Sequence, residues 1–263
     1  MTDALAKSMN QLIFQSSIGR QKPRTIDQPD LTSSACPFCD LTQLPAILKK
    51  DGDILLVPNK YPILLNSTPL VLIETSQCDS ELSLYTEEHL LRVFDMALST
   101  WFEMMDSKQF ASVLFFKNHG PFSGGSIRHP HMQLIGLEQV EYRQNITHQD
   151  FVGSVIWAKS GVELTLSQWP RIGFAEFNIK LSNRDQWPEM CRLIQKTVRY
   201  ILQYYQSGRA TSYNIFFYLL DDLVYCKVMP RFVTTPLFIG YSIPQVSDNQ
   251  NAMVADFQEK FFK

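Results

Sequence analysis

The sequence has no run of apolar residues that approaches the roughly 20 needed to cross a lipid bilayer. Residues 1–15 mix charged and amide side chains with apolar ones. This segment therefore lacks the continuous apolar centre of a secretory signal. We expect a cytoplasmic protein that does not bind a membrane.

The chain also has no excess of charge of one sign. Its 24 basic and 26 acidic residues give a formal net charge of −2 at pH 7. Proteins that bind nucleic acid usually carry a strongly basic face, so we expect no nucleic-acid partner. A local group of basic residues for a phosphorylated small molecule is compatible with the same balance.

Cysteine is scarce and odd in number, with five residues in the chain. Two of them form the pair Cys36-x-x-Cys39, a spacing that favours a metal over a disulfide in a reducing compartment. A tetrahedral zinc site needs two further ligands, for which Cys78, Cys191, Cys226 and the five histidines are candidates. The spacing alone leaves open the alternative that the cysteines are small buried apolar residues.

Apolar patterning divides the first half of the chain into short elements. Residues 17–35 contain two prolines and three basic residues and predict an irregular arm. A helical spacing of apolar residues predicts a helix over residues 81–106. Short apolar runs predict strands over residues 54–57, 69–74, 112–116 and 129–137.

The second half repeats this alternation. Residues 172–181 predict a strand, and residues 187–205 predict a helix with proline in its first turn. Residues 213–219 and 223–229 predict a hairpin that turns at Asp221-Asp222. The polar tail after Gln245 is expected to be peripheral.

The run from Arg128 to Gln133 carries the chemistry. Side chains two apart on a strand share a face, so His129, His131 and Gln133 are expected to point into one site. A neutral imidazole can attack phosphorus, and an amide can stabilise the charge that develops on a phosphoryl oxygen. The preceding turn at Gly124-Gly125-Ser126 offers backbone and hydroxyl donors to phosphate. The alternative is a pair of strand histidines with no joint role.

These residues also carry a resemblance. Asn118-His119-Gly120, followed by Gly124 to Gln133, resembles the active-site segment of the galactose-1-phosphate uridylyltransferases, which belong to the histidine-triad superfamily. Asn59-Lys60-Tyr61-Pro62 and the Cys36/Cys39 pair are similar to further segments of that family, as is Phe238 to Tyr241.

The resemblance implies a role for each residue of the central motif. His131 would be the nucleophile that becomes uridylylated or adenylylated, with Gln133 and Ser126 contacting phosphate. His129 would bind a structural zinc ion together with Cys36 and Cys39. Cys78 stands where the family has a histidine ligand, and His119 is the nearest substitute if Cys78 does not bind.

The resemblance also implies further contacts and one absence. Substrate-binding residues would be Asn118, Gly124, Gly125, Asn59 and Arg24. A solvated basic segment is the alternative for the arm around Arg24. Lys227-Val228-Met229 replaces a His-x-His of some members, so their second, iron-binding site is expected to be absent. Arg128 and Met132 also differ from the family pattern, which leaves galactose-1-phosphate in doubt as the acceptor.

The fold class expected from this resemblance is α+β. Two histidine-triad-like halves, residues 1–150 and 151–263, would each contain an antiparallel sheet with packed helices. The expected activity is that of a nucleotidyltransferase acting on a nucleotide or nucleotide-sugar and a phosphorylated small molecule, in a homodimer. The alternatives are a dinucleoside-polyphosphate or nucleotide hydrolase or phosphorylase, and a zinc-stabilised nucleotide-binding protein without turnover.

Overall fold

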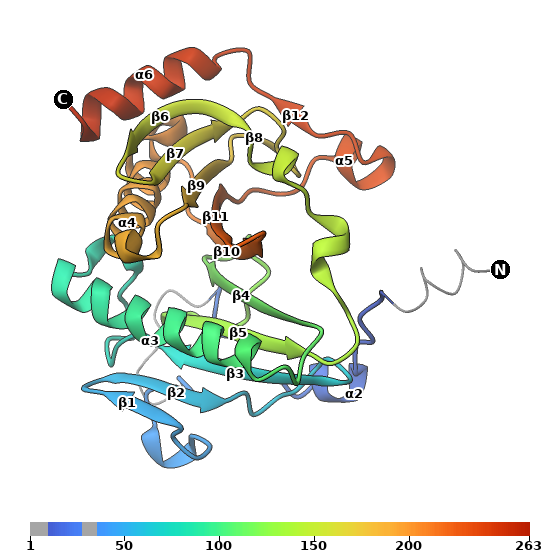
Figure 1. Cartoon of the computed structure of the whole chain (residues 1–263). Coiled ribbons are helices and arrows are strands. Elements are labelled where there is room, and N and C mark those ends of the chain that lie inside the picture. Colours follow the sequence, from blue (N-terminus) through green and yellow to red (C-terminus); the bar gives the residue numbers. More distant parts are fainter. Residues whose placement is uncertain (1–9, 28–35) are drawn as a thin grey trace. The chain divides into compact units, whose positions relative to one another are not determined.

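The computed structural model describes residues 10–27 and 36–263, which fold as two compact units (Figure 1). The first unit comprises the described residues up to Lys117 together with Gly125–Asn145. The second comprises Asn118–Gly124 and Ile146–Lys263. Among the described residues, no helix is both long and apolar enough to cross a membrane.

The first unit is built around an antiparallel sheet with the strand order β1-β2-β3-β5-β4. Helix α3 packs on this sheet, where Trp101 Nε1 donates a hydrogen bond of 3.0 Å to the carbonyl of Val113. The strands and helices are α2 (Ser16–Gly19), β1 (Lys49–Asp51), β2 (Ile54–Pro58), β3 (Ser67–Ile73), α3 (Glu87–Asp106), β4 (Ser112–His119) and β5 (His131–Leu137).

Helix α3 begins where the sequence offers a cap. The Thr86 hydroxyl accepts a hydrogen bond of 3.3 Å from the His89 backbone N–H, and Glu87 and Glu88 lie in the first turn. Negative charge there interacts favourably with the positive end of the helix dipole and stabilises the start of the helix. The apolar stripe of α3 is fully buried at Leu90, Val93, Phe94, Ala97 and Trp101.

One face of this sheet carries the central motif. His131 and Gln133 lie on the same face of β5, directly opposite Ile73 and Val71 of β3. Ile73 and Val71 belong to a buried apolar cluster that continues into β2 and into the segment before β1. Its other members are Leu55 and Val57, with Phe38 and Leu44 packed against them.

In the second unit, antiparallel strands follow the order β10-β11-β9-β7-β6, and β8 pairs with β12 in parallel. Helix α4 packs on β9, β11 and β7, and helix α6 packs on β6. The strands and helices are β6 (Gly153–Lys159), β7 (Val162–Ser167), β8 (Gly173–Phe174), β9 (Phe177–Leu181), α4 (Trp187–Gln203), β10 (Tyr213–Leu220), β11 (Leu223–Pro230), α5 (Pro236–Tyr241), β12 (Gln245–Val246) and α6 (Gln250–Phe261).

Short 3₁₀ helices connect elements in both units. They are η2 (Leu41–Gln43), η3 (Leu82–Leu84), η4 (Tyr142–Asn145), η5 (His148–Phe151), η6 (Arg184–Gln186) and η7 (Tyr205–Gly208).

The prediction of an α+β fold with antiparallel sheets and packed helices is confirmed. The predicted hairpin is also present, with positive φ at Asp221 and Asp222, as the tight turn requires. The hairpin of β6 and β7 was not expected from the sequence.

Several predicted elements differ in the structure. The helix predicted over residues 81–106 begins only at Glu87, after the separate 3₁₀ helix η3. The strand over residues 172–181 is divided into β8, which pairs with β12, and β9, which pairs with β7 and β11; Gly173 and Phe174 have φ of +144° and +61°. Strand β5 begins at His131, so His129 precedes it. The arm over residues 17–35 includes the last residues of α2, and its residues 28–35 lie outside the described part of the chain.

The tail after Gln245 was expected to be peripheral, and that expectation is wrong. Helix α6 contributes Phe257, which is 0% exposed. Its ring lies 4.5 Å from the ring of Tyr200 in α4 and 5.7 Å from that of Phe177 in β9, measured between centroids. Apolar residues spaced along an otherwise polar tail therefore complete the core of the second unit.

Candidate active site and metal centre

Three cysteines and one histidine of the first unit converge on one point. One ligand atom from each of Cys36, Cys39, Cys78 and His129 lies within 4.8 Å of all the others. Cys36 and Cys39 come together in a turn in which the Cys39 N–H donates to the Cys36 carbonyl. Cys78 follows β3, and His129 precedes β5. The alternative ligand, His119, stacks on Tyr213 in the second unit.

The neighbours of His129 determine which ring nitrogen can bind a metal. Nε2 lies 2.7 Å from the backbone carbonyl oxygen of Thr75, which can only accept a hydrogen bond. Nε2 therefore carries the proton, and the lone pair of a neutral ring is on Nδ1. Nδ1 is the atom that faces the sulfur atoms of Cys36 and Cys39.

The spacing of these atoms fits a tetrahedral ion. Zinc bonds of about 2.3 Å to sulfur and about 2.0–2.1 Å to nitrogen put the two ligand atoms about 3.5 Å apart. Both sulfur atoms lie 3.5 Å from His129 Nδ1. The Thr75 carbonyl is then the outer partner that orients the histidine ligand.

The ionisation of the thiols also favours a bound cation. Burial alone would raise the pKa of Cys36, but hydrogen bonding to the His129 ring and the Phe38 backbone N–H lowers that pKa to about 7. Burial and the neighbouring Cys36 raise the pKa of Cys78. The first thiolate thus opposes ionisation of the next, and a bound cation would relieve this opposition.

In His131 the available ring nitrogen is Nε2, whereas in His129 it is Nδ1. The Nδ1 atom of His131 lies 2.7 Å from the carbonyl oxygen of His129 and must donate a proton to it. Its Nε2 therefore holds the lone pair of the neutral ring and has no hydrogen-bond partner among the described residues. The Phe38 ring packs edge-on against this imidazole, with centroids 5.3 Å apart.

The surroundings of His131 keep its ring neutral. Burial lowers the pKa of His131 to about 3, against the opposing effect of the hydrogen bond to the His129 carbonyl. The positive charges of Lys117 and Lys22 lower this pKa further.

A buried ion pair lies behind His131. Lys117 Nζ is 2.5 Å from Glu74 Oε1, and the two side chains are 1% and 0% exposed. Lys117 Nζ also lies 3.5 Å from the His131 carbonyl oxygen, at the limit of a hydrogen bond. The Tyr85 hydroxyl donates to Glu74 Oε2 at 2.9 Å, so both carboxylate oxygens are engaged. No feature of the sequence by itself had marked this pair.

The basic arm is attached to the turn that precedes the motif. The backbone N–H groups of Thr25 and Ile26 donate to the Ser126 carbonyl at 2.7 and 3.1 Å. The Thr25 hydroxyl in turn accepts from the backbone N–H of Arg128 at 3.0 Å. The arm is therefore bonded to the segment that leads into the motif.

The arm offers a different basic residue from the one predicted. Arg24 forms an ion pair of 2.6 Å with Asp27, and both side chains are largely exposed. Lys22 is partly buried, which lowers the pKa of its ammonium group, and its charge acts on His131. Burial and electrostatic range, which the sequence does not reveal, distinguish the two cations.

The remaining predicted residues divide between the units. Gln133 is partly buried on β5, and Gly125 belongs to the first unit. The side-chain oxygen of Asn59 accepts from the Tyr61 backbone N–H at 2.9 Å, in a turn after β2. Asn118 and Gly124 belong to the second unit, where Gly124 has φ of +81°.

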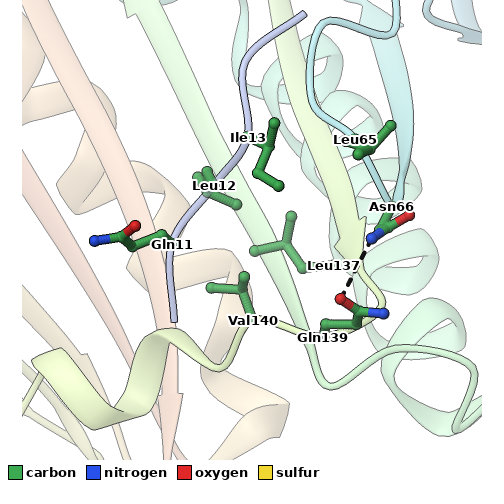
Figure 2. Close-up of a pocket in the computed structure, with 8 residues that line it drawn as sticks. All are labelled: Gln11, Leu12, Ile13, Leu65, Asn66, Leu137, Gln139 and Val140. Atoms are coloured by element: carbon green, nitrogen blue, oxygen red, sulfur yellow. Dashed lines mark hydrogen bonds between the residues drawn. The ribbon is translucent and has the colours of Figure 1, made fainter. Parts of the chain in front are cut away.

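A pocket of about 170 Å³ in the first unit lies apart from these residues (Figure 2). Its polar side chains are amides, and Asn66 Nδ2 donates to Gln139 Oε1 at 3.3 Å across its rim. The rest of the lining is apolar: Leu12, Ile13, Leu65, Leu137 and Val140. It offers no nucleophile, acid or base.

Comparison with known proteins supports the fold. Residues 14–140 match the N-terminal domain, and residues 143–262 the C-terminal domain, of a family described as a domain of unknown function, DUF4931. The crystal structure of a DUF4931 family protein from Bacillus cereus is 41% identical, with a TM-score of 0.76, and covers 83% of this chain and 100% of its own. No curated protein matches the sequence.

Two more distant structures have the same fold. A uridylyltransferase is 16% identical, with a TM-score of 0.69, over 91% of this chain and 96% of its own. An ADP-glucose phosphorylase from Arabidopsis thaliana, solved with bound ADP-glucose, is 15% identical, with a TM-score of 0.68, over 95% and 98%. The predicted resemblance to uridylyltransferases is thus confirmed for the fold. The chain belongs to the DUF4931 family.

Proposed function

We propose that this protein is a nucleotidyltransferase that works through a covalent nucleotidyl-histidine intermediate on His131. The observation that carries the proposal is the protonation pattern of His131. Its Nδ1 donates to the His129 carbonyl, so Nε2 of a buried, neutral ring is free to act as the nucleophile. The same carbonyl stabilises the positive charge that the ring gains when Nε2 bonds to phosphorus.

The two steps balance as a double displacement. Nε2 of His131 attacks the α-phosphorus of a nucleoside diphosphate compound, a phosphorus–nitrogen bond forms, and the bond to the leaving phosphate or sugar phosphate breaks. The leaving oxygen keeps the electron pair. An acceptor phosphate then attacks phosphorus, and the electron pair of the phosphorus–nitrogen bond returns to Nε2.

Other residues take supporting roles in this proposal. Gln133 donates its amide to a phosphoryl oxygen, and Ser126 contacts the leaving phosphate. The remaining contacts to the nucleotide and its phosphates are proposed for Asn118, Gly124, Gly125, Asn59 and Arg24, with Lys22 added because its charge lowers the pKa of His131.

Zinc is the ion that best suits the donor set of Cys36, Cys39, Cys78 and His129. These are soft sulfur ligands and one imidazole, and they fill four positions, so the ion would be structural. It would hold Phe38, which lies between two of the ligands, against the His131 ring. A homodimer, a cytoplasmic location and two halves divided at residue 150 stay predictions.

The test is detection of the intermediate. The purified protein is incubated separately with UDP-glucose, ADP-glucose and diadenosine polyphosphates, and its intact mass is measured after rapid quenching in base. We expect an added uridylyl or adenylyl group, which identifies the nucleotide. The His131→Gly variant should fold and acquire no added mass, whereas the His148→Gly control, altered at a surface histidine of the second unit, should behave as the parent.

The outcomes separate the candidate functions. An adduct that water or inorganic phosphate discharges would indicate a hydrolase or phosphorylase, and one that only a sugar phosphate discharges would indicate a transferase. Tight nucleotide binding without an adduct from any donor would indicate a binding protein. Turnover by His131→Gly at the parental rate would refute the covalent mechanism.

A further inference from the structure

A chain of hydrogen bonds in the second unit ends at Asn118. Arg231 Nη1 donates to Asn214 Oδ1 at 2.5 Å, and Asn214 Nδ2 donates to Asn118 Oδ1 at 2.6 Å. Asn214 Nδ2 also donates to the Ser123 carbonyl at 3.0 Å. Asn214 is 1% exposed, so water does not compete for these bonds.

The chemistry of arginine decides the direction of every bond in this chain. A guanidinium group has only donors, so the atom of Asn214 that faces Arg231 must be its oxygen. The Asn214 nitrogen is then the atom that faces Asn118, and both of its hydrogens are used, one on Asn118 and one on Ser123. Asn118 must present its own oxygen to Asn214.

The consequence is a fixed orientation for the Asn118 amide. Its oxygen is occupied by Asn214, and its nitrogen has no hydrogen-bond partner among the described residues. The side chain is partly exposed, so the free end offers N–H donors to the outside. A reversed amide would place two nitrogens against each other and forfeit the short bond to Asn214.

The same contacts close the loop of residues 118–124. Asn214 bonds both to Asn118 at its start and to Ser123 near its end. The Phe122 backbone N–H donates to the Ser212 hydroxyl at 3.1 Å. At Gly120, which has φ of +79°, a Cβ would lie 2.2 Å from the Thr211 carbonyl oxygen, so a side chain is excluded there. The loop is therefore held against the residues at the start of β10.

We propose that Asn214 and Arg231 are positioning residues that turn the Asn118 amide so that its N–H donors face the phosphate of the substrate. The inference rests on the proposed function, in which Asn118 contacts the nucleotide. It adds two residues from β10 and the end of β11 to the determinants of phosphate binding. Phosphate oxygens are acceptors, so an amide locked with nitrogen outward favours them, and a reversed amide would repel them.

Asn214→Asp is the sharpest variant. The new carboxylate has nearly the shape of the amide and can pair with the Arg231 guanidinium, which offsets part of the stability lost with the hydrogen bond to the Ser123 carbonyl. It cannot donate to Asn118, whose amide must then turn its nitrogen inward and its oxygen outward. We expect binding of ADP, UDP and inorganic diphosphate to weaken roughly 10- to 100-fold in titration calorimetry, as for loss of a hydrogen bond to a charged group.

A double-mutant cycle separates orientation from the added charge. The charge of Asn214→Asp acts in every background, whereas the orientation effect requires the Asn118 amide. We expect Asn214→Asp to weaken binding much less in an Asn118→Ala background than in the parent. Asn183→Asp adds the same charge at an exposed site of the second unit and should change affinity less than about twofold.

Three results would overturn the inference. They are an equal effect of Asn214→Asp in both backgrounds, no effect of Asn118→Ala on binding, and no binding of any of the three phosphate compounds by the parent. Failure of the proposed function is a separate result, because an absent nucleotidyl adduct leaves the binding cycle measurable. Unfolding midpoints of all variants are recorded to exclude loss of the fold.

Discussion

His129 and His131 are two residues apart, and a backbone carbonyl gives each a different chemical character. The Thr75 carbonyl accepts a hydrogen bond from the protonated Nε2 of His129, so the lone pair on Nδ1 is available for a metal. The His129 carbonyl accepts a hydrogen bond from the protonated Nδ1 of His131, so the lone pair on Nε2 is available for a substrate. The sequence motif identifies the two histidines, but the carbonyl group that each contacts determines which ring nitrogen is available to react.

Lys22 is the residue whose importance the structure raises most. Its partly buried ammonium group acts on His131, whereas Arg24 is paired with Asp27 at the surface. We expect Lys22→Met to weaken ADP or UDP binding about tenfold or more by loss of a charge-assisted contact to phosphate. The matched Arg24→Met change should cost no more than about twofold.

Titration calorimetry at low and high salt measures both variants. The difference in nucleotide affinity between the parent and Lys22→Met should become smaller as salt screens the charge. Screening is weaker for a partly buried group than for an exposed one. A larger effect of Arg24→Met than of Lys22→Met would contradict this assignment and favour the residue predicted from the sequence.

At the scale of elements, the Lys117–Glu74 pair connects β4 to the end of β3 behind β5. Because both side chains are buried, Lys117→Met should leave the Glu74 carboxylate without its cation and lower the free energy of unfolding by about 3–5 kcal/mol. The double change Lys117→Met with Glu74→Gln should recover part of this loss. Urea unfolding followed by circular dichroism measures both effects.

If the double variant had a lower free energy of unfolding than Lys117→Met alone, the two side chains would not be coupled. A single Lys117→Met change that costs less than about 1 kcal/mol would mean that water reaches the carboxylate after all. Exposed pairs such as Lys49 with Glu103 serve as the comparison, since Lys49→Met should have a small effect.

Periodicity located most elements because long amphipathic helices and apolar strands have strong local patterns. Helix α3 and the β10–β11 hairpin are examples. Periodicity failed where local conformation or long-range packing decides. A predicted strand is divided because β8 and β9 pair with different strands, and Phe257 is buried only because α6 packs on β6.

At the scale of the whole molecule, all four candidate metal ligands belong to the first unit. We expect purified protein to contain about one equivalent of zinc by elemental analysis. A strong chelator should then increase amide hydrogen exchange in residues 36–78 and near His131, because the ligands join three segments of that unit. Strands β7 and β9 and helix α4 of the second unit should keep their protection.

Uniform loss of protection in both units would show that the metal stabilises the molecule as a whole. Zinc far below one equivalent in protein prepared without chelator would refute the metal assignment. Cys191, buried in the second unit, provides the control, since Cys191→Ser should leave the zinc content unchanged while Cys36→Ser lowers it.

The sequence by itself determined which types of functional group the site contains and how they are spaced along the chain. The cysteine pair, the alternating His-Pro-His-x-Gln string and the glycine turn are patterns of neighbours, so their spacing predicts a metal centre and phosphate chemistry. Tertiary structure alone decided which distant residues join them. Cys78 rather than His119 lies with the other candidate ligands, the charge of Lys22 lowers the pKa of His131, and Arg231, Asn214 and Asn118 form a chain of hydrogen bonds. Burial, hydrogen-bond direction and charge at a distance arise only when segments far apart in the chain meet.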